Sequence, residues 1–182
     1  MPMEISRSSL SISAGLRPPE EGNLSNGAEL QQIEELDKIR IATMALSETV
    51  RVSVRFSEVD PIRVVWHGNY LKYMEDAREA FGRKYGLSYV TIVENGYYCP
   101  IFDYHVRFMH SASYDDELLV TIKYKPSRGA KICFEYEIRR ERDDKVVLTA
   151  STIQLFTTSD GVLEPSEPEF YRQWKSKFKE LK

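Results

Sequence analysis

The sequence predicts an α+β domain in which an antiparallel sheet covers one long helix. Residues 70–81 have helical periodicity, and most of the later segments alternate apolar with polar residues and are joined by short turn sequences. Strands therefore do not alternate with helices along the chain, and this order disfavours a doubly wound parallel sheet.

The long predicted helix has one apolar face. Its apolar residues recur at intervals of three and four: Tyr70, Tyr73, Met74, Ala77, Ala80 and Phe81. Asn69 is a favoured N-cap residue, Gly68 before it allows a tight turn, and Gly86 is a natural stop. The free N–H groups of the first helical turn attract partial negative charge, including a polarised carbonyl oxygen.

Alternation of apolar and polar residues predicts the strands. The residues that we expect to share the buried face of the first strand are Val50, Val52, Val54 and Phe56. Later strands are predicted at 97–109, 118–124, 132–138 and 146–156, with turns at 115–116, 125–129, 143–144 and 160–161. An amphipathic helix is predicted from 167 to 181.

Composition limits the class of protein. The chain of 182 residues suits one domain of ordinary size, and 42% hydrophobic with 29% charged residues is typical of a globular protein. A formal charge of −3 with scattered basic residues gives no reason to expect nucleic-acid binding. We interpret Cys99 and Cys133 as reduced core or half-core residues, because their spacing fits neither a metal site nor a disulfide framework. His105 and His110 have no partner at ligand spacing, so no metal site is expected.

The chain divides into three predicted parts. Residues 1–27 are rich in Ser, Pro, Gly and Asn and are predicted to be a flexible N-terminal tail. Residues 28–43 carry apolar residues at helical spacing and are predicted to be an accessory helical extension, and 44–182 are the domain itself. There is no continuous apolar segment typical of a secretory signal and no run of about 18 apolar residues, so we expect no membrane span and a cytoplasmic location.

The segment 55–81 carries the candidate chemistry. Pro61 disfavours the helical conformation for Asp60, which should therefore end an extended segment. The predicted helix start at Gly68 and Asn69 follows closely, so the Asp60 carboxylate is expected near the positive end of a helix. That arrangement is suited to chemistry at a carbonyl group.

The run DPIRVVWHGNYLKYMEDARE resembles the signature of the 4-hydroxybenzoyl-CoA thioesterase-like branch of hotdog-fold acyl-CoA thioesterases. The likeness covers residues 49–158. It implies the hotdog fold and hydrolysis of an acyl-CoA or acyl carrier protein thioester to free acid and thiol. By the resemblance, Asp60 matches the catalytic carboxylate, and His67 matches the position whose backbone N–H polarises the thioester carbonyl. The family commonly has Gly two or three residues after the Asp-Pro step, where this sequence has Ile62-Arg63, which bears on substrate preference.

The resemblance also implies a substrate site and an assembly. The residues expected to bind substrate are Trp66, Gly68, Asn69, Tyr70 and Arg128, the last through the phosphates of a coenzyme. Coenzyme A is then part of the substrate, and no separate cofactor is expected. In the family two units pair edge to edge with the site between them, so we expect a homodimer or a homotetramer.

Alternatives remain open from the sequence. Asp60 has a plain interpretation as a loop carboxylate that accepts hydrogen bonds from nearby N–H groups. Glu58 is either an assistant to Asp60 through a water or a hydrogen-bonded rim residue. Two other functions compete with hydrolysis: a 3-hydroxyacyl-thioester dehydratase and a non-catalytic acyl-thioester binding protein. The dehydratase is disfavoured because His67 is followed by Gly-Asn-Tyr and not by a Phe-Pro-Gly type segment.

Overall fold

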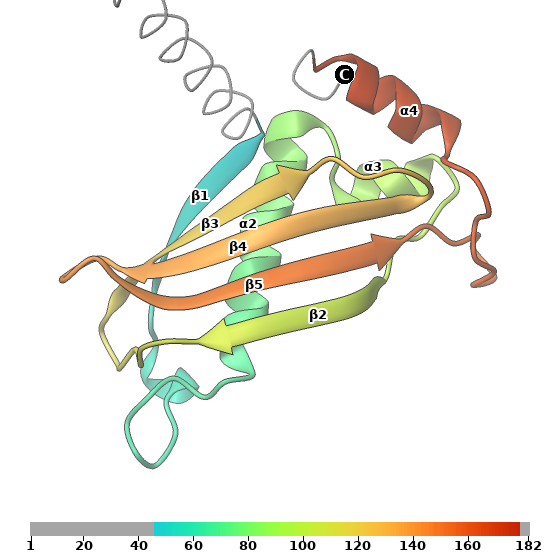
Figure 1. Cartoon of the computed structure of the whole chain (residues 1–182). Helices are drawn as coiled ribbons and strands as arrows, with labels where there is room; N and C mark the ends of the chain where they lie inside the picture. The colour runs from blue at the N-terminus through green and yellow to red at the C-terminus, as the bar shows by residue number, and fades with distance from the viewer. Residues whose placement is uncertain (1–45, 179–182) are drawn as a thin grey trace, which may run out of the picture. The chain divides into compact units, whose positions relative to one another are not determined.

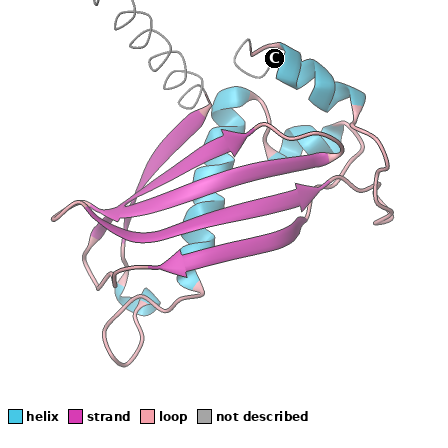
Figure 2. Cartoon of the chain, in the orientation of Figure 1, coloured by secondary structure: helices cyan, strands magenta, loops and turns pink. Residues whose placement is uncertain are grey.

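The computed structural model describes residues 46–178, which form a five-stranded antiparallel sheet packed against one long helix (Figure 1). The strands lie in the order β1-β3-β4-β5-β2. Their bounds are β1 Ser47–Ser53, β2 Ile101–Phe108, β3 Glu117–Lys125, β4 Lys131–Arg140 and β5 Lys145–Leu155. The helices are η1 Phe56–Glu58, a short 3-10 turn, α2 Asn69–Tyr85, α3 Tyr89–Glu94 and α4 Glu169–Ser176 (Figure 2). The predicted α+β architecture is confirmed.

The core lies between α2 and the inner face of the sheet. The helix contributes the residues that the periodicity selected: Tyr70, Tyr73, Met74, Ala77 and Phe81 are all buried, and Ala80 is half-buried. The sheet contributes the alternating residues of β3 and β4: Leu118, Val120, Ile122, Tyr124, Ile132, Phe134, Tyr136 and Ile138. Each large apolar side chain buried here contributes about 1.5–3 kcal/mol of transfer free energy. Gly86 ends α2 in the left-handed conformation, as predicted.

The cysteines and hairpins also agree with the sequence. Cys99 is buried, Cys133 is half-buried, and both are free thiols. The turns 125–129 and 143–144 join β3 to β4 and β4 to β5, with Gly129 and Asp144 at positive φ.

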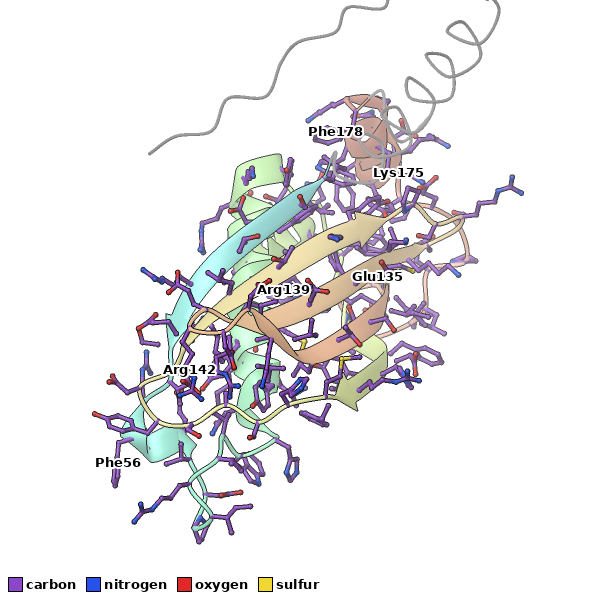
Figure 3. All side chains as sticks on the ribbon, turned by 60° about the vertical axis from the view of Figure 1, so that its left-hand side comes forward. Phe56, Glu135, Arg139, Arg142, Lys175 and Phe178 are labelled. Carbon is purple, nitrogen blue, oxygen red and sulfur yellow. The ribbon has the colours of Figure 1, made fainter. Side chains whose placement is uncertain are left out.

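Phe56 does not continue the first strand, and that prediction is wrong. Pairing of β1 with β3 ends at Ser53 opposite Glu117, after which the chain leaves the sheet and turns through η1. The Phe56 side chain is 77% exposed and protrudes from the body of the domain (Figure 3). Alternation alone does not show where pairing stops.

The start of β2, the presence of α3 and the length of α4 also differ from the prediction. The strand expected from residue 97 begins at Ile101, because Tyr98 exchanges backbone hydrogen bonds with Thr157 outside the main ladder. Helix α3 was not predicted; Ser88 caps it by accepting a hydrogen bond from the Thr91 N–H at 3.1 Å. Helix α4 is shorter at both ends than the predicted 167–181.

The predicted tail, residues 1–27, and the predicted extension, residues 28–43, lie outside the described residues. Within 46–178, no helix is both long and apolar enough to cross a bilayer.

Candidate active site

Asp60 lies in a small hairpin between η1 and α2. Its N–H donates to the Val64 carbonyl at 2.8 Å, and its own carbonyl accepts from the Arg63 N–H at 2.8 Å. Its Oδ1 accepts from the N–H groups of Ile62 at 3.0 Å and Val64 at 3.4 Å. Within the described part of the chain Oδ2 accepts no hydrogen bond. One carboxylate oxygen therefore holds the loop, as the plain interpretation requires, and the second is available for chemistry.

Arg63 occupies the loop position that favours glycine. Its φ is +65°, in the left-handed region, where a side chain costs roughly 1–2 kcal/mol. The turn closed by the Asp60 carbonyl and the Arg63 N–H forms nonetheless. The departure from the family pattern therefore leaves the turn intact and adds backbone strain next to Asp60.

The helix start differs from the prediction at Asn69. Gly68 is the N-cap, no side chain caps α2, and Asn69 is the first helical residue. Asn69 is buried, and its Nδ2 donates to the Glu58 carbonyl at 2.9 Å. The N-cap prediction is wrong because this amide is used across the chain to fasten the η1 segment to the helix.

The N–H groups of His67 and Gly68 make no hydrogen bond within residues 46–178. Both lie at the amino end of the 17-residue helix α2, where the helix dipole is positive. The His67 side chain is exposed. Two unpaired backbone donors at this place can bind an oxygen that gains negative charge.

Glu58 is a structural tie. One of its carboxylate oxygens accepts from the Tyr73 hydroxyl at 2.8 Å and from the Arg55 N–H at 2.8 Å. Burial, with the hydrogen bond to Glu58 second, raises the pKa of Tyr73, which keeps this hydroxyl a donor. Of the two interpretations of Glu58, the hydrogen-bonded residue is the one that the contacts support.

Trp66, Gly68 and Tyr70 pack around the helix start. A Cβ on Gly68 would lie 2.0 Å from Cζ3 of the Trp66 indole, so any larger residue must displace that ring. The Trp66 ring centroid lies 4.9 Å from that of His67, and the Trp66 side chain is half-exposed. Tyr70 is buried, its ring centroid lies 5.6 Å from that of Phe108, and burial raises its pKa.

A hollow of about 310 Å³ opens beside His67 and Tyr70, and Asp60, Trp66 and Gly68 do not line it. Its lining consists of Val64, Val65, His67, Tyr70, Phe108, Met109, His110 and Ser111. His110 was not selected from the sequence for this site, because no local pattern links it to His67. Its Nδ1 lies 2.7 Å from the Val146 carbonyl, which can only accept, so Nδ1 carries the proton.

A charged cluster, buried at Arg140 and Asp116 and exposed at Asp143, supports the wall of this hollow. Arg140 donates to the Ser111 carbonyl at 2.6 Å and to both carboxylate oxygens of Asp143, at 2.9 and 2.7 Å. Asp116, which is 4% exposed, accepts from the Ser113 N–H at 2.8 Å. The Arg140 guanidinium holds the pKa of Asp143 down to about 2. The sequence showed these residues only as turn and strand-end positions.

Arg128 does not join the other predicted site residues within one protomer. The Asp60 hairpin lies at the Glu117 end of β3, where the Val54 N–H donates to the Asp116 carbonyl. The turn carrying Arg128 follows the other end of β3, about 26 Å away at 3.3 Å per residue. Within residues 46–178, no three His, Cys, Asp or Glu side chains are grouped so that they could hold a metal ion.

A five-stranded antiparallel sheet packed against one long helix is the architecture of the hotdog fold. The chain belongs to the Thioesterase-like superfamily, whose family model matches residues 54–174. It is therefore a thioesterase.

Named relatives and a solved structure support the assignment to the thioesterases. The chain is 31% identical to 4-hydroxybenzoyl-CoA thioesterase of Pseudomonas sp. strain CBS-3 over 65% of this chain and 88% of the relative. It is 27% identical to acyl-CoA thioesterase YbgC of Haemophilus influenzae, over 72% and 93% respectively. The structure of DHNA-CoA thioesterase from Staphylococcus aureus superposes with a TM-score of 0.66 at 25% identity, covering 72% of this chain and 89% of that one.

Proposed function

We propose that this enzyme hydrolyses an acyl-CoA thioester to a free acid and coenzyme A, with Asp60 as the catalytic carboxylate. One observation carries the assignment of Asp60. One continuous segment, 60–68, carries two features. The first is an Asp60 carboxylate oxygen that accepts no hydrogen bond within residues 46–178, and the second is a pair of unpaired backbone N–H groups at the amino end of α2. In the proposed complex a substrate carbonyl binds those donors, and its carbon faces the carboxylate.

The His67 N–H donates a hydrogen bond to the carbonyl oxygen, and the Gly68 N–H is placed to share it. This bond strengthens as negative charge grows on the oxygen in the transition state, because the donors are already oriented. Loss of such a donor typically lowers the rate by about 100-fold or more. The His67 imidazole has no assigned step, so His67 acts through its backbone.

Asp60 acts by one of two routes that need only water. As a nucleophile, its carboxylate forms a bond to the acyl carbon, the C–S bond breaks, the thiolate takes a proton from solvent, and water then hydrolyses the mixed anhydride. As a general base, it takes a proton from a water whose oxygen attacks the acyl carbon, and the departing thiolate is protonated. Both routes consume one water, and neither requires a cofactor.

A homodimer is the assembly that the exposed edge supports. Strand β2 lies at the edge of the sheet, and unpaired edges are normally covered in proteins. Large apolar side chains are exposed on or beside it: Ile101 43%, Phe102 72%, Phe108 52% and Met109 49%. Pairing of two β2 strands would cover both the edge and this apolar surface. A tetramer of two such dimers and a cytoplasmic location remain expectations.

A two-fold pairing across β2 also gives Arg128 a place. The turn 125–129 lies at the end of the sheet where β2 begins, while Asp60 and the hollow of about 310 Å³ lie where β2 ends. An antiparallel pair of β2 strands sets the beginning of one strand beside the end of the other. We therefore propose that the partner subunit's Arg128 contacts coenzyme A phosphates at the Asp60 site.

The test is thiol release from short, long and aromatic acyl-CoAs by the native protein and Asp60→Asn. Asn retains an acceptor for the Ile62 and Val64 N–H groups, so the loop should persist while kcat falls by about 100- to 10,000-fold. Asp160→Asn, a turn carboxylate outside the site, is the matched control and should keep full activity. Release that survives Asp60→Asn would remove Asp60 from the mechanism, and binding without release would favour the non-catalytic alternative.

A further inference from the structure

His110 lines the hollow of about 310 Å³, and its ring is held in a fixed orientation. Its Nδ1–H donates to the Val146 carbonyl at 2.7 Å, and its backbone N–H donates to the Val147 carbonyl at 3.1 Å. The side chain is exposed, and within residues 46–178 its Nε2 makes no hydrogen bond. A hydrogen bond at one ring nitrogen orients the other, an arrangement typical of histidines that transfer protons. Nε2 of His110 is thus an oriented group that the fold itself does not use.

Segment 110–113 runs antiparallel to the segment that leads into α2. The Val65 N–H donates to the Ala112 carbonyl at 2.8 Å, and an antiparallel bridge joins the same two segments. This pairing brings His67 and His110 to the same end of the two segments, where both line the hollow. In the proposed complex, the thioester carbonyl that binds the His67 N–H therefore lies beside His110.

Nucleophilic attack by Asp60 creates a need for a proton at the leaving group. The tetrahedral intermediate carries two groups that can depart, the Asp60 carboxylate and the thiolate of coenzyme A. A carboxylic acid has a pKa about 4–5 below that of an alkyl thiol, so the carboxylate is expelled more readily and the intermediate returns to substrate. A proton delivered to sulfur as the C–S bond breaks removes this disadvantage.

We propose that His110 is the general acid that protonates the departing sulfur. The inference rests on the proposed thioester hydrolysis and deepens it, because it names the proton donor that takes the place of solvent. Asp60 forms its bond to the acyl carbon, the C–S bond breaks, and the Nε2–H of the His110 imidazolium gives its proton to sulfur. Coenzyme A leaves as the thiol, and His110 becomes neutral with Nδ1 still bound to the Val146 carbonyl.

The second half of the reaction returns the proton to His110. Water attacks the acyl carbon of the mixed anhydride, and Nε2 of the neutral ring takes a proton from that water. The bond between the acyl carbon and the Asp60 oxygen breaks, which releases the free acid and restores the ionised carboxylate. The enzyme returns to its starting state after consuming one water, and no further reactant is needed.

Two other groups that line the hollow are less suited to this role. Burial raises the pKa of the Tyr70 hydroxyl, which therefore holds its proton more firmly. The His67 ring packs beside Trp66 and makes no hydrogen bond in the described part of the chain, so neither of its nitrogens is oriented. His110 is the histidine of the hollow whose free nitrogen has a fixed direction.

The first experiment varies the leaving group. Three thioesters of the acyl group that the native enzyme hydrolyses best are compared: the acyl-CoA, the acyl-pantetheine and the 4-nitrothiophenyl ester, whose thiol is a much stronger acid. Because kcat/KM includes all steps up to thiol release, it is measured for the native enzyme and for His110→Asn. The asparagine amide can keep the hydrogen bond to the Val146 carbonyl but cannot supply a proton.

For His110→Asn, kcat/KM should fall by about 100-fold or more with the two alkyl thioesters and by less than about threefold with the 4-nitrothiophenyl ester. An acidic thiol departs without protonation, which is why the third ester should be spared. An equal loss with all three esters would mean that His110 only supports the hollow. No loss with any ester would mean that the sulfur needs no proton from His110. Either result would overturn the proposal.

Two controls separate proton transfer from folding. His105→Asn, at an exposed histidine on β2 outside the site, should keep native values with all three esters. A thioether analogue of the acyl-CoA, which cannot be hydrolysed, should bind His110→Asn as tightly as the native enzyme in titration calorimetry, because binding involves no proton transfer to sulfur. If His110→Asn binds the analogue more weakly, His110→Gln is measured with the three esters, and the same pattern is required of it.

Asp60→Asn distinguishes this inference from the proposed function. Its activity should fall with all three esters, since Asp60 attacks the acyl carbon whatever the leaving group. If Asp60→Asn is inactive but His110→Asn slows all three esters equally, the proton donor is wrong and the proposed function stands. If Asp60→Asn still releases thiol while His110→Asn spares only the 4-nitrothiophenyl ester, the role of Asp60 is wrong and the general acid stands.

Discussion

Replacement of Arg63 by Gly should stabilise the enzyme. Arg63 has a φ of +65°, and within residues 46–178 its exposed side chain makes no hydrogen bond or ion pair. Relief of the left-handed strain is worth roughly 1–2 kcal/mol, and the greater freedom of glycine in the unfolded chain returns about 0.5–1 kcal/mol. The free energy of unfolding should therefore rise by about 0.5–1 kcal/mol, which corresponds to a Tm increase of roughly 2–5 °C.

Urea unfolding followed by tryptophan fluorescence measures this difference. Ile62→Gly is the matched control: Ile62 is 77% exposed and has no positive φ, so the same substitution one residue earlier should lower the free energy of unfolding by about 0.5–1 kcal/mol. Thiol release by Arg63→Gly should stay within about twofold of native, because the Asp60–Arg63 turn keeps its backbone hydrogen bond. A destabilised Arg63→Gly, or equal effects of the two substitutions, would refute the assignment of strain to this position.

Three further predictions concern the edge, the turn and the charged cluster. Phe102 on β2 is 72% exposed, and Phe102→Arg should give monomers by light scattering and lower kcat/KM by at least about tenfold. The control variant Val162→Arg, at a side chain that is 60% exposed and distant in sequence from β2, should remain dimeric. Arg128→Ala should raise KM for an acyl-CoA by about 3- to 10-fold and leave the corresponding acyl-pantetheine unaffected, since pantetheine lacks the nucleotide phosphates. Arg140 depresses the pKa of Asp143 from 3.8 to about 2 in the folded state. This pair should therefore stabilise the protein above pH 4 and lose that contribution as the pH falls toward 2. Asp143→Asn should remove this part of the pH dependence of urea unfolding.

The sequence predicted most accurately which residues of the strands and of the long helix are buried, because that burial follows from a local repeating pattern. Burial of Leu118, Val120 and Ile122 follows from a period of two, and burial of Tyr73 and Met74 follows from helical spacing. These patterns report directly which face of an element meets the core. Phe56 continued the same alternation and was placed wrongly, because the end of β1 is set by its pairing with β3 and not by its own sequence.

The candidate site was predicted only where its residues are neighbours in the chain. Asp60, His67 and Gly68 fall within nine positions, so the motif and the helix start selected them together as candidates. His110 lines the same hollow as His67 but follows the end of β2, and Arg140 supports that hollow from β4, so neither carries a local signal. Asn69 shows the limit at a single residue: its preference for the N-cap was outweighed by a hydrogen bond to the Glu58 carbonyl, 11 residues earlier.

The same distinction explains why Gln154 could not be selected from sequence. On β5 it occupies an inward position of the alternating pattern, where a polar residue reads as an interruption of an apolar face. Only the fold shows that Nε2 is held by the Cys99 carbonyl and that Oε1 is left buried and unpaired. A polar side chain of this kind is hard to justify by stability, because an apolar residue of similar volume would leave no acceptor unsatisfied.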